Sequence, residues 1–165
     1  MKKISMVLLI LAGFLPSYAQ QISVSEAGIL ALNFFNERTR IHHPDKISEI
    51  TILNQSGIHE NGRLVMYAVN FAPEGYVLVS ASKYTFPVLG YSLRGEYSGL
   101  NEPENYKAWV RYYGRQMEYA DQSGIAAPEI LALHKRWSDD NSLKMSLSGN
   151  RVVEPLLRTT WDQGN

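Results

Sequence analysis

Side chains that could act as nucleophiles or bases are few in this sequence, and they do not form a recognisable catalytic pattern. Ser80 and Ser82 end an apolar run, and His134 lies much further along the chain. Neither serine sits in a nucleophile elbow, and no base stands at a recognisable spacing. The chain has no cysteine, so it contains no thiol nucleophile, thiolate metal site or disulfide. The pattern therefore predicts a chain without catalytic activity of its own.

Metal-binding chemistry is equally sparse. His42 and His43 are adjacent, but no third histidine or carboxylate stands at a supporting spacing. The Asp139-Asp140 pair lies in a polar stretch. This position indicates solvent-exposed linker residues and not a catalytic pair of carboxylates. We therefore predict no metal site and no cofactor.

Composition indicates one globular domain. The 165 residues are 45% hydrophobic and 19% charged, which is enough for one core. Net charge is zero, and it becomes −2 without Lys2 and Lys3. Such a balance gives no reason to expect nucleic acid or an anionic membrane surface as partner.

The first 19 residues have the layout of a signal peptide. A short basic start precedes an apolar run over 4–15, and Ser17 and Ala19 suit a cleavage site before Gln20. The apolar run is short for a membrane span, which makes an uncleaved anchor the weaker alternative. We expect a secreted or periplasmic protein that has no membrane attachment after cleavage.

Residues 64–92 are the structural centre of the sequence. Three apolar runs, 64–71, 76–80 and 88–92, are typical of strands, and Pro73-Glu74-Gly75 suits a hairpin turn between the first two. Residues 47–53 predict one more strand, joined through a polar loop over 54–62. Together they predict an antiparallel sheet of about four strands.

Helical patterns flank this sheet. Ser23 and Glu26 form a capping-box pattern, followed by an apolar stripe at Ala27, Leu30, Ala31, Phe34 and Phe35. A second helix is expected with Asn101 as its cap, and its core-facing stripe comprises Tyr106, Trp109, Val110, Tyr113, Met117 and Ala120. A third, 129–137, is expected along the sheet. The predicted fold class is α+β, with two to three helices packed on the sheet.

The C-terminal part changes character. Residues 138–150 are polar and without period, which indicates an exposed linker, and Lys144 and Arg151 within or beside it suit proteolytic processing. Residues 151–165 then carry large apolar side chains outside any periodic element. Such a segment is expected to meet a partner surface.

Several segments together resemble one known family. Gly75-Tyr76-Val77-Leu78-Val79-Ser80, followed by Pro87-Val88-Leu89-Gly90-Tyr91-Ser92, resembles the "GFVIVS … P.LGYS" signature of streptopain-type cysteine peptidase propeptides and of related standalone inhibitors. Residues 151–165 are similar to the opening of the catalytic domain in those peptidases. The resemblance covers about residues 22–165 and stops short of the catalytic cysteine.

This resemblance implies a domain plan and a partner. Residues 20–137 would form a propeptide or inhibitor domain, 138–150 a linker with a processing site, and 151–165 the truncated start of a catalytic domain. In this family the α+β propeptide docks on the streptopain-type catalytic domain and keeps the zymogen inactive until the linker is cut.

Two inhibitory contacts follow from the resemblance. Glu104-Asn105-Tyr106 is similar to the "EN" dipeptide of the streptopain propeptide, which implies that Asn105 is a plug residue; a routine capping or turn role is the alternative. The connection from Ser82 to Phe86 is the second candidate, with Ser82, Lys83 and Tyr84 as contact residues. It departs from the charged "DDR/DKR" type of relatives, since only Lys83 is charged.

Three functions remain open at this point. The first is the non-catalytic prodomain of a secreted streptopain-type peptidase precursor, which inhibits the enzyme and assists its folding. The second is a standalone secreted inhibitor of such a peptidase. The third is a secreted binding module unrelated to peptidases. The apolar tail over 151–165 favours the first over the second.

Overall fold

The computed structural model describes residues 21–42 and 50–139. The predicted signal peptide, residues 47–49 of the first predicted strand, almost all of the predicted linker with Lys144, and the segment 151–165 with Arg151 lie outside the described residues. His43 of the histidine pair does so too. Within the described residues, none of the helices combines the length and the apolar character needed to cross a bilayer.

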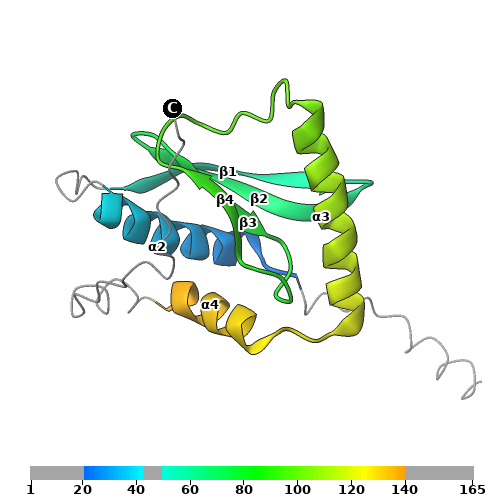
Figure 1. Cartoon of the computed structure of the whole chain (residues 1–165). Helices are drawn as coiled ribbons and strands as arrows, with labels where there is room; N and C mark the ends of the chain where they lie inside the picture. Colours follow the sequence, from blue (N-terminus) through cyan, green and yellow to red (C-terminus); the bar gives the residue numbers. More distant parts are fainter. Residues whose placement is uncertain (1–20, 43–49, 140–165) are drawn as a thin grey trace, which may run out of the picture.

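The described residues form one antiparallel sheet and three helices, which confirms the predicted α+β class (Figure 1). The strands follow one another across the sheet in the order β1-β2-β3-β4. The elements are α2 (Val24–His42), β1 (Thr51–Glu60), β2 (Arg63–Ala72), β3 (Tyr76–Ser80), β4 (Val88–Ser92), α3 (Glu104–Ser123) and α4 (Pro128–Ser138).

Both faces of β2 are covered, which explains its nearly continuous apolar sequence. Phe71 stacks on Phe35 of α2, with ring centroids 4.3 Å apart. Its neighbour Asn70 points to the opposite face, where its side-chain amide donates to the backbone oxygen of Tyr97 at 2.9 Å. Figure 1 shows the sheet lying between α2 and α3.

The first helix begins as predicted. The Ser23 backbone N–H donates to the Glu26 carboxylate at 2.8 Å, and the Glu26 N–H donates to Ser23 Oγ at 3.2 Å. These reciprocal bonds satisfy two N–H groups that the first helical turn leaves unpaired. The five residues of the predicted stripe are all buried in the core.

The predicted polar loop over 54–62 is wrong, because β1 continues to Glu60 and only Asn61 and Gly62 form the turn. Both turn residues have positive φ, 51° and 76°, as a tight two-residue hairpin requires. β1 is an edge strand, so polar residues are tolerated on it. The register shifts after Ile52, where Leu53 is an extra residue of β1 that breaks its alternation, and after Ile58, where the extra residue is Val65 of β2.

Two helix expectations are also corrected. Asn101 does not cap α3: the cap position is Pro103, which makes no side-chain cap hydrogen bond. Helix α4 packs on α2 and not along the sheet. Trp137 of α4 makes an edge-to-face contact with Phe34 at 5.1 Å, and its backbone oxygen accepts from the Asn33 amide at 2.7 Å.

Gly75, in the turn between β2 and β3, has a backbone conformation that favours glycine and no space for a side chain. Its φ is +107°, and a Cβ would lie 2.4 Å from the Phe35 ring and 2.9 Å from the Ser92 backbone oxygen. Gly62 has a similar positive φ but nothing within 4 Å of its Cβ position. A side chain at Gly62 would meet backbone strain alone, whereas one at Gly75 would meet both backbone strain and steric overlap.

Gly75→Ala should therefore destabilise the fold more than Gly62→Ala. We expect about 1 kcal/mol for Gly62→Ala from backbone strain, and about 1–3 kcal/mol more for Gly75→Ala from overpacking. Urea unfolding of the two variants measures this difference. Equal losses would show that the packing around Phe35 relaxes freely.

Candidate functional site

The connection between β3 and β4, residues 81–87, carries three of the four predicted contact residues and is here called the braced loop. Its ends are tied to the sheet. The Ala81 N–H donates to Val65 O at 3.0 Å, and the Ser80 N–H donates to Pro87 O at 2.9 Å. The Ile22 N–H donates to Ala81 O at 2.9 Å, so the strand-like start of the described chain also lies against the loop.

Ser82 shapes the braced loop from inside and is 1% exposed. Its hydroxyl donates to the Asp121 carboxylate of α3 and accepts from the Tyr84 N–H at 3.1 Å. The same carboxylate pairs with the Arg63 guanidinium at the start of β2. In this conformation a partner protein cannot touch the Ser82 side chain, so any contribution from it acts through the shape of the loop.

Lys83 and Tyr84 are half-buried and lie at the accessible side of the braced loop. Lys83 Nζ lies 3.2 Å from the Glu26 carboxylate of α2. That carboxylate already accepts a hydrogen bond from the Ser23 backbone N–H. This bond is the main cause that lowers the pKa of Glu26, and the Ser23 side chain and Lys83 lower it further. An exposed pair of this kind contributes little stability, so Lys83 can exchange Glu26 for a partner at small cost.

Thr85 joins a buried cluster of three hydroxyl groups. Its Oγ1 lies 2.6 Å from Ser80 Oγ, and the Tyr113 hydroxyl of α3 contacts both, at 2.8 and 3.1 Å. Burial raises the pKa of Tyr113. Ser80 is therefore enclosed by other hydroxyls, with no base among the hydrogen-bond partners found for it.

His134 of α4 braces the other side of Thr85. Its Nε2 lies 2.9 Å from the Thr85 carbonyl oxygen. Because a carbonyl only accepts, Nε2 carries the proton in this contact. Burial is the main cause that lowers the pKa of His134, with Lys83 adding to the effect, while the Thr85 bond and Glu26 oppose it. The ring thus contacts the loop backbone, and neither serine is among the hydrogen-bond partners found for it in the described residues.

Asn105 lies at the other candidate contact, in the first turn of α3. It is exposed, and its Oδ1 accepts from the Tyr106 N–H at 2.9 Å. The approach to this turn is fixed by Asn70, which accepts from the Tyr97 N–H at 2.9 Å. The Tyr97 hydroxyl contacts Glu102 and Tyr106, and burial followed by the Glu102 bond raises the pKa of Tyr97 far above its ordinary range.

The structure brings Ser82, Lys83 and Tyr84 together but keeps Asn105 apart from them. Ser82 contacts Asp121 in the last turns of α3, whereas Asn105 lies in its first turn. At 1.5 Å per helical residue, Asn105 and Asp121 are separated by about 24 Å along the axis. One interface can include both contacts, but they would meet different parts of the partner surface.

The sequence profile of the Spi protease inhibitor family matches residues 19–117. This chain belongs to that family. The match contains α2, the whole sheet, the braced loop and α3 as far as Met117. Two braces of the loop in this Spi domain, Asp121 and His134, lie beyond the matched segment.

One curated relative is a much larger protein. The thiol protease/hemagglutinin PrtT of Porphyromonas gingivalis is 28% identical over 153 residues, which covers 88% of this chain. The chain spans only 17% of the length of that relative. No solved structure matches the Spi domain significantly.

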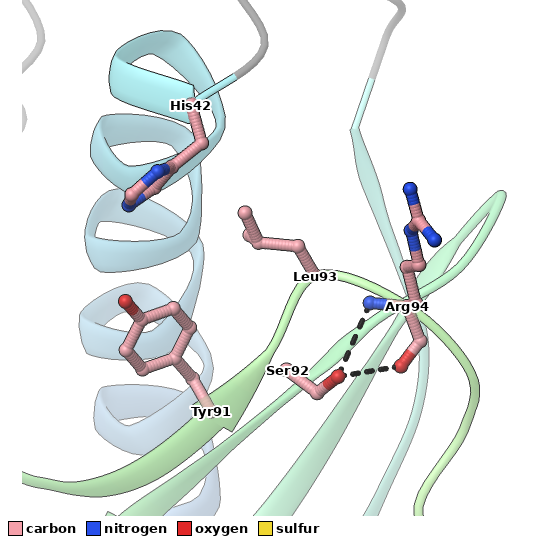
Figure 2. A pocket seen from close by; sticks show the side chains of 5 residues that line it. All are labelled: His42, Tyr91, Ser92, Leu93 and Arg94. Carbon is pink, nitrogen blue, oxygen red and sulfur yellow. Dashed lines mark hydrogen bonds between the residues drawn. The ribbon is translucent and has the colours of Figure 1, made fainter. Parts of the chain in front are cut away.

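A hollow elsewhere on the Spi domain offers no comparable arrangement. It lies between the end of α2 and the end of β4 and is lined by His42, Tyr91, Ser92, Leu93 and Arg94 (Figure 2). The Ser92 hydroxyl is engaged by the Arg94 backbone, accepting from its N–H at 3.2 Å and donating to its oxygen at 2.7 Å. Across residues 21–42 and 50–139, no group of three metal-ligating side chains occurs.

Sequence reasoning found the braced loop but missed what holds it. Asp121 and His134 are single polar residues in helices, and nothing in their spacing points to Ser82 or Thr85. Tyr113 was assigned correctly to a core-facing stripe, but its hydroxyl contacts depend on how α3 crosses the sheet. The available signal was a serine and a threonine in a short connection between two apolar strands. If such a connection is buried, its hydroxyl groups need hydrogen-bond partners.

Stability of the Spi domain should fall on mild acidification through His134. The folded pKa is lowered, so below pH of about 6.5 the unfolded chain binds the proton more readily and unfolding is favoured. His134→Gln keeps a donor for the Thr85 carbonyl but does not titrate. We expect its free energy of unfolding to fall less than that of the wild type between pH 7.5 and pH 5, measured by urea titration.

The matched control is His59→Gln, at an exposed position in β1. This variant should keep the pH dependence of the wild type. If His134→Gln and His59→Gln show the same slope, His134 does not carry the effect.

Proposed function

We propose that this chain is the non-catalytic prodomain of a secreted streptopain-type cysteine peptidase precursor. It inhibits the peptidase until the linker is cleaved, and it assists the folding of the catalytic domain. The observation that carries this proposal is membership of the Spi protease inhibitor family. Export through the predicted signal peptide belongs to the same proposal.

The similarity to PrtT supports a prodomain over a standalone inhibitor. A match that covers 88% of this chain must extend past residue 117, where the family profile ends. That relative is named as a thiol protease. The similarity therefore continues past the inhibitor segment into a further part of a named protease, as expected of a prodomain. Family membership also argues against a binding module unrelated to peptidases.

The described architecture suits this role. A rigid sheet presents the braced loop and the start of α3, while Ser80 and Ser82 are buried and no histidine is among the hydrogen-bond partners found for them. A prodomain tethered to its target also gains an effective concentration on the order of millimolar. Modest intrinsic affinity then suffices, and cutting the linker weakens the inhibition.

A standalone inhibitor remains the second candidate, because the family takes its description from a protease inhibitor. The two differ in whether cleavage between residues 138 and 150 relieves inhibition. In a prodomain, the covalent link to the enzyme strengthens the inhibition, so cutting the linker weakens it.

The purified chain should inhibit streptopain-type cysteine peptidases added separately. We expect reversible inhibition of mature streptopain or of the active PrtT protease in a peptide-substrate assay, with no hydrolysis by the chain alone. A serine peptidase serves as specificity control. Absence of inhibition of both cysteine peptidases at chain concentrations up to about 1 mM, the effective concentration of a tethered prodomain, would contradict the proposal.

Processing is expected beside Lys144 and Arg151. Brief trypsin treatment followed by mass spectrometry should show cleavage after these residues before cleavage after Lys135, which lies within α4. The Lys144→Gln, Arg151→Gln double variant should delay the first cut, whereas Lys135→Gln should not. Earlier cleavage inside α4 would contradict an exposed processing linker.

A further inference from the structure

Phe86 is the one residue of the braced loop whose large apolar side chain faces solvent. It is 53% exposed, whereas Phe34, Phe35 and Phe71 are all at most 4% exposed. Its neighbours are buried: Thr85 is 9% exposed, and Pro87 is among the fully buried side chains. An aromatic ring therefore projects from a loop that is otherwise embedded in the domain.

The backbone on both sides of Phe86 is fixed. The Thr85 carbonyl is held by His134 Nε2 at 2.9 Å, and the Pro87 carbonyl by the Ser80 N–H at 2.9 Å. The Thr85 hydroxyl is held by Tyr113 at 2.8 Å. Little conformational freedom remains for a partner to remove, so binding through this ring carries a small entropic cost.

We propose that Phe86 is the anchor of the inhibitory contact and inserts into an apolar side-chain pocket of the partner peptidase. This inference rests on the proposed function and specifies its contact. Peptidases bind substrate side chains in pockets beside the bond to be cut, and a fixed aromatic ring fits such a pocket as a substrate side chain does. Aromatic residues on rigid supports also dominate the binding energy of many interfaces.

The same geometry explains how the Phe86 ring can bind the peptidase without the loop being hydrolysed. Attack on a peptide bond requires its carbonyl to turn into the oxyanion hole of the enzyme. The carbonyls of the Thr85–Phe86 and Pro87–Val88 bonds are already hydrogen-bonded inside the domain. The bond between them has proline as its amine partner, with no N–H and a ring on nitrogen. The side chain thus enters the enzyme while all three bonds are withheld.

Phe86→Ala in the full chain tests the anchor. We expect its inhibition constant against active PrtT protease and mature streptopain to rise by about 30-fold, the loss typical of an interface hot spot. Phe86→Leu should recover part of the affinity, because it keeps an apolar side chain. Tyr119→Ala is the matched control, since Tyr119 is an aromatic residue 76% exposed on α3, and it should inhibit like the wild type.

Folding is checked by urea unfolding, which should be unchanged in Phe86→Ala because the ring is largely exposed. Mass spectrometry after prolonged incubation with the peptidase should show no cut between residues 85 and 88. Equal inhibition by wild type and Phe86→Ala, or a cut in that segment, would overturn the inference. If the wild type inhibits and only Asn105→Ala loses affinity, the anchor lies at α3 and the proposed function stands. A wild type without inhibition would overturn the proposed function itself.

Discussion

A loop can lie inside a protein only if its polar groups find hydrogen-bond partners there. The braced loop meets this requirement with partners from three directions, namely Asp121 and Tyr113 of α3, His134 of α4 and the backbone of the sheet. Burying an unpaired hydroxyl or carbonyl costs on the order of 1–3 kcal/mol. The positions of α3 and α4 around the sheet are therefore coupled to the conformation of a few residues between β3 and β4.

The Asp121 carboxylate connects three separate segments of the fold. It accepts from Ser82 in the loop and pairs with Arg63 at the start of β2. One side chain thus links the β1–β2 hairpin, the braced loop and the end of α3. The hydroxyl cluster of Ser80, Thr85 and Tyr113 makes a second link nearby. Together they make the loop part of the core, with Phe86 projecting outward.

Local signals in the sequence predicted much of the fold. The capping box at Ser23, the stripe ending at Phe35 and the turn before Gly75 each depend on residues close together in the chain, and each was confirmed. The extent of β1 was missed because the register shift after Ile52 breaks the alternation on which the prediction relied. The packing of α4 was missed because an apolar stripe does not specify whether it faces a sheet or another helix.

The candidate site was predictable only in outline. The family resemblance pointed to the 82–86 connection and to Asn105, but burial of Ser82 and separation of the two contacts follow from the crossing of α3 over the sheet. The contacts from Asp121 to Ser82 and from His134 to Thr85 join residues 39 and 49 positions apart. Such pairs have no local signature, because tertiary packing alone brings them together.

The segment shared with the Spi family ends at Met117, whereas Asp121 and His134 follow it. Transplanting the shared segment alone onto another protein would carry the loop but leave two of its supports behind. The supports of the loop thus extend beyond the segment that the family profile matches. A substitution at Asp121 or His134 would therefore change how the loop is held without changing any residue of the sheet.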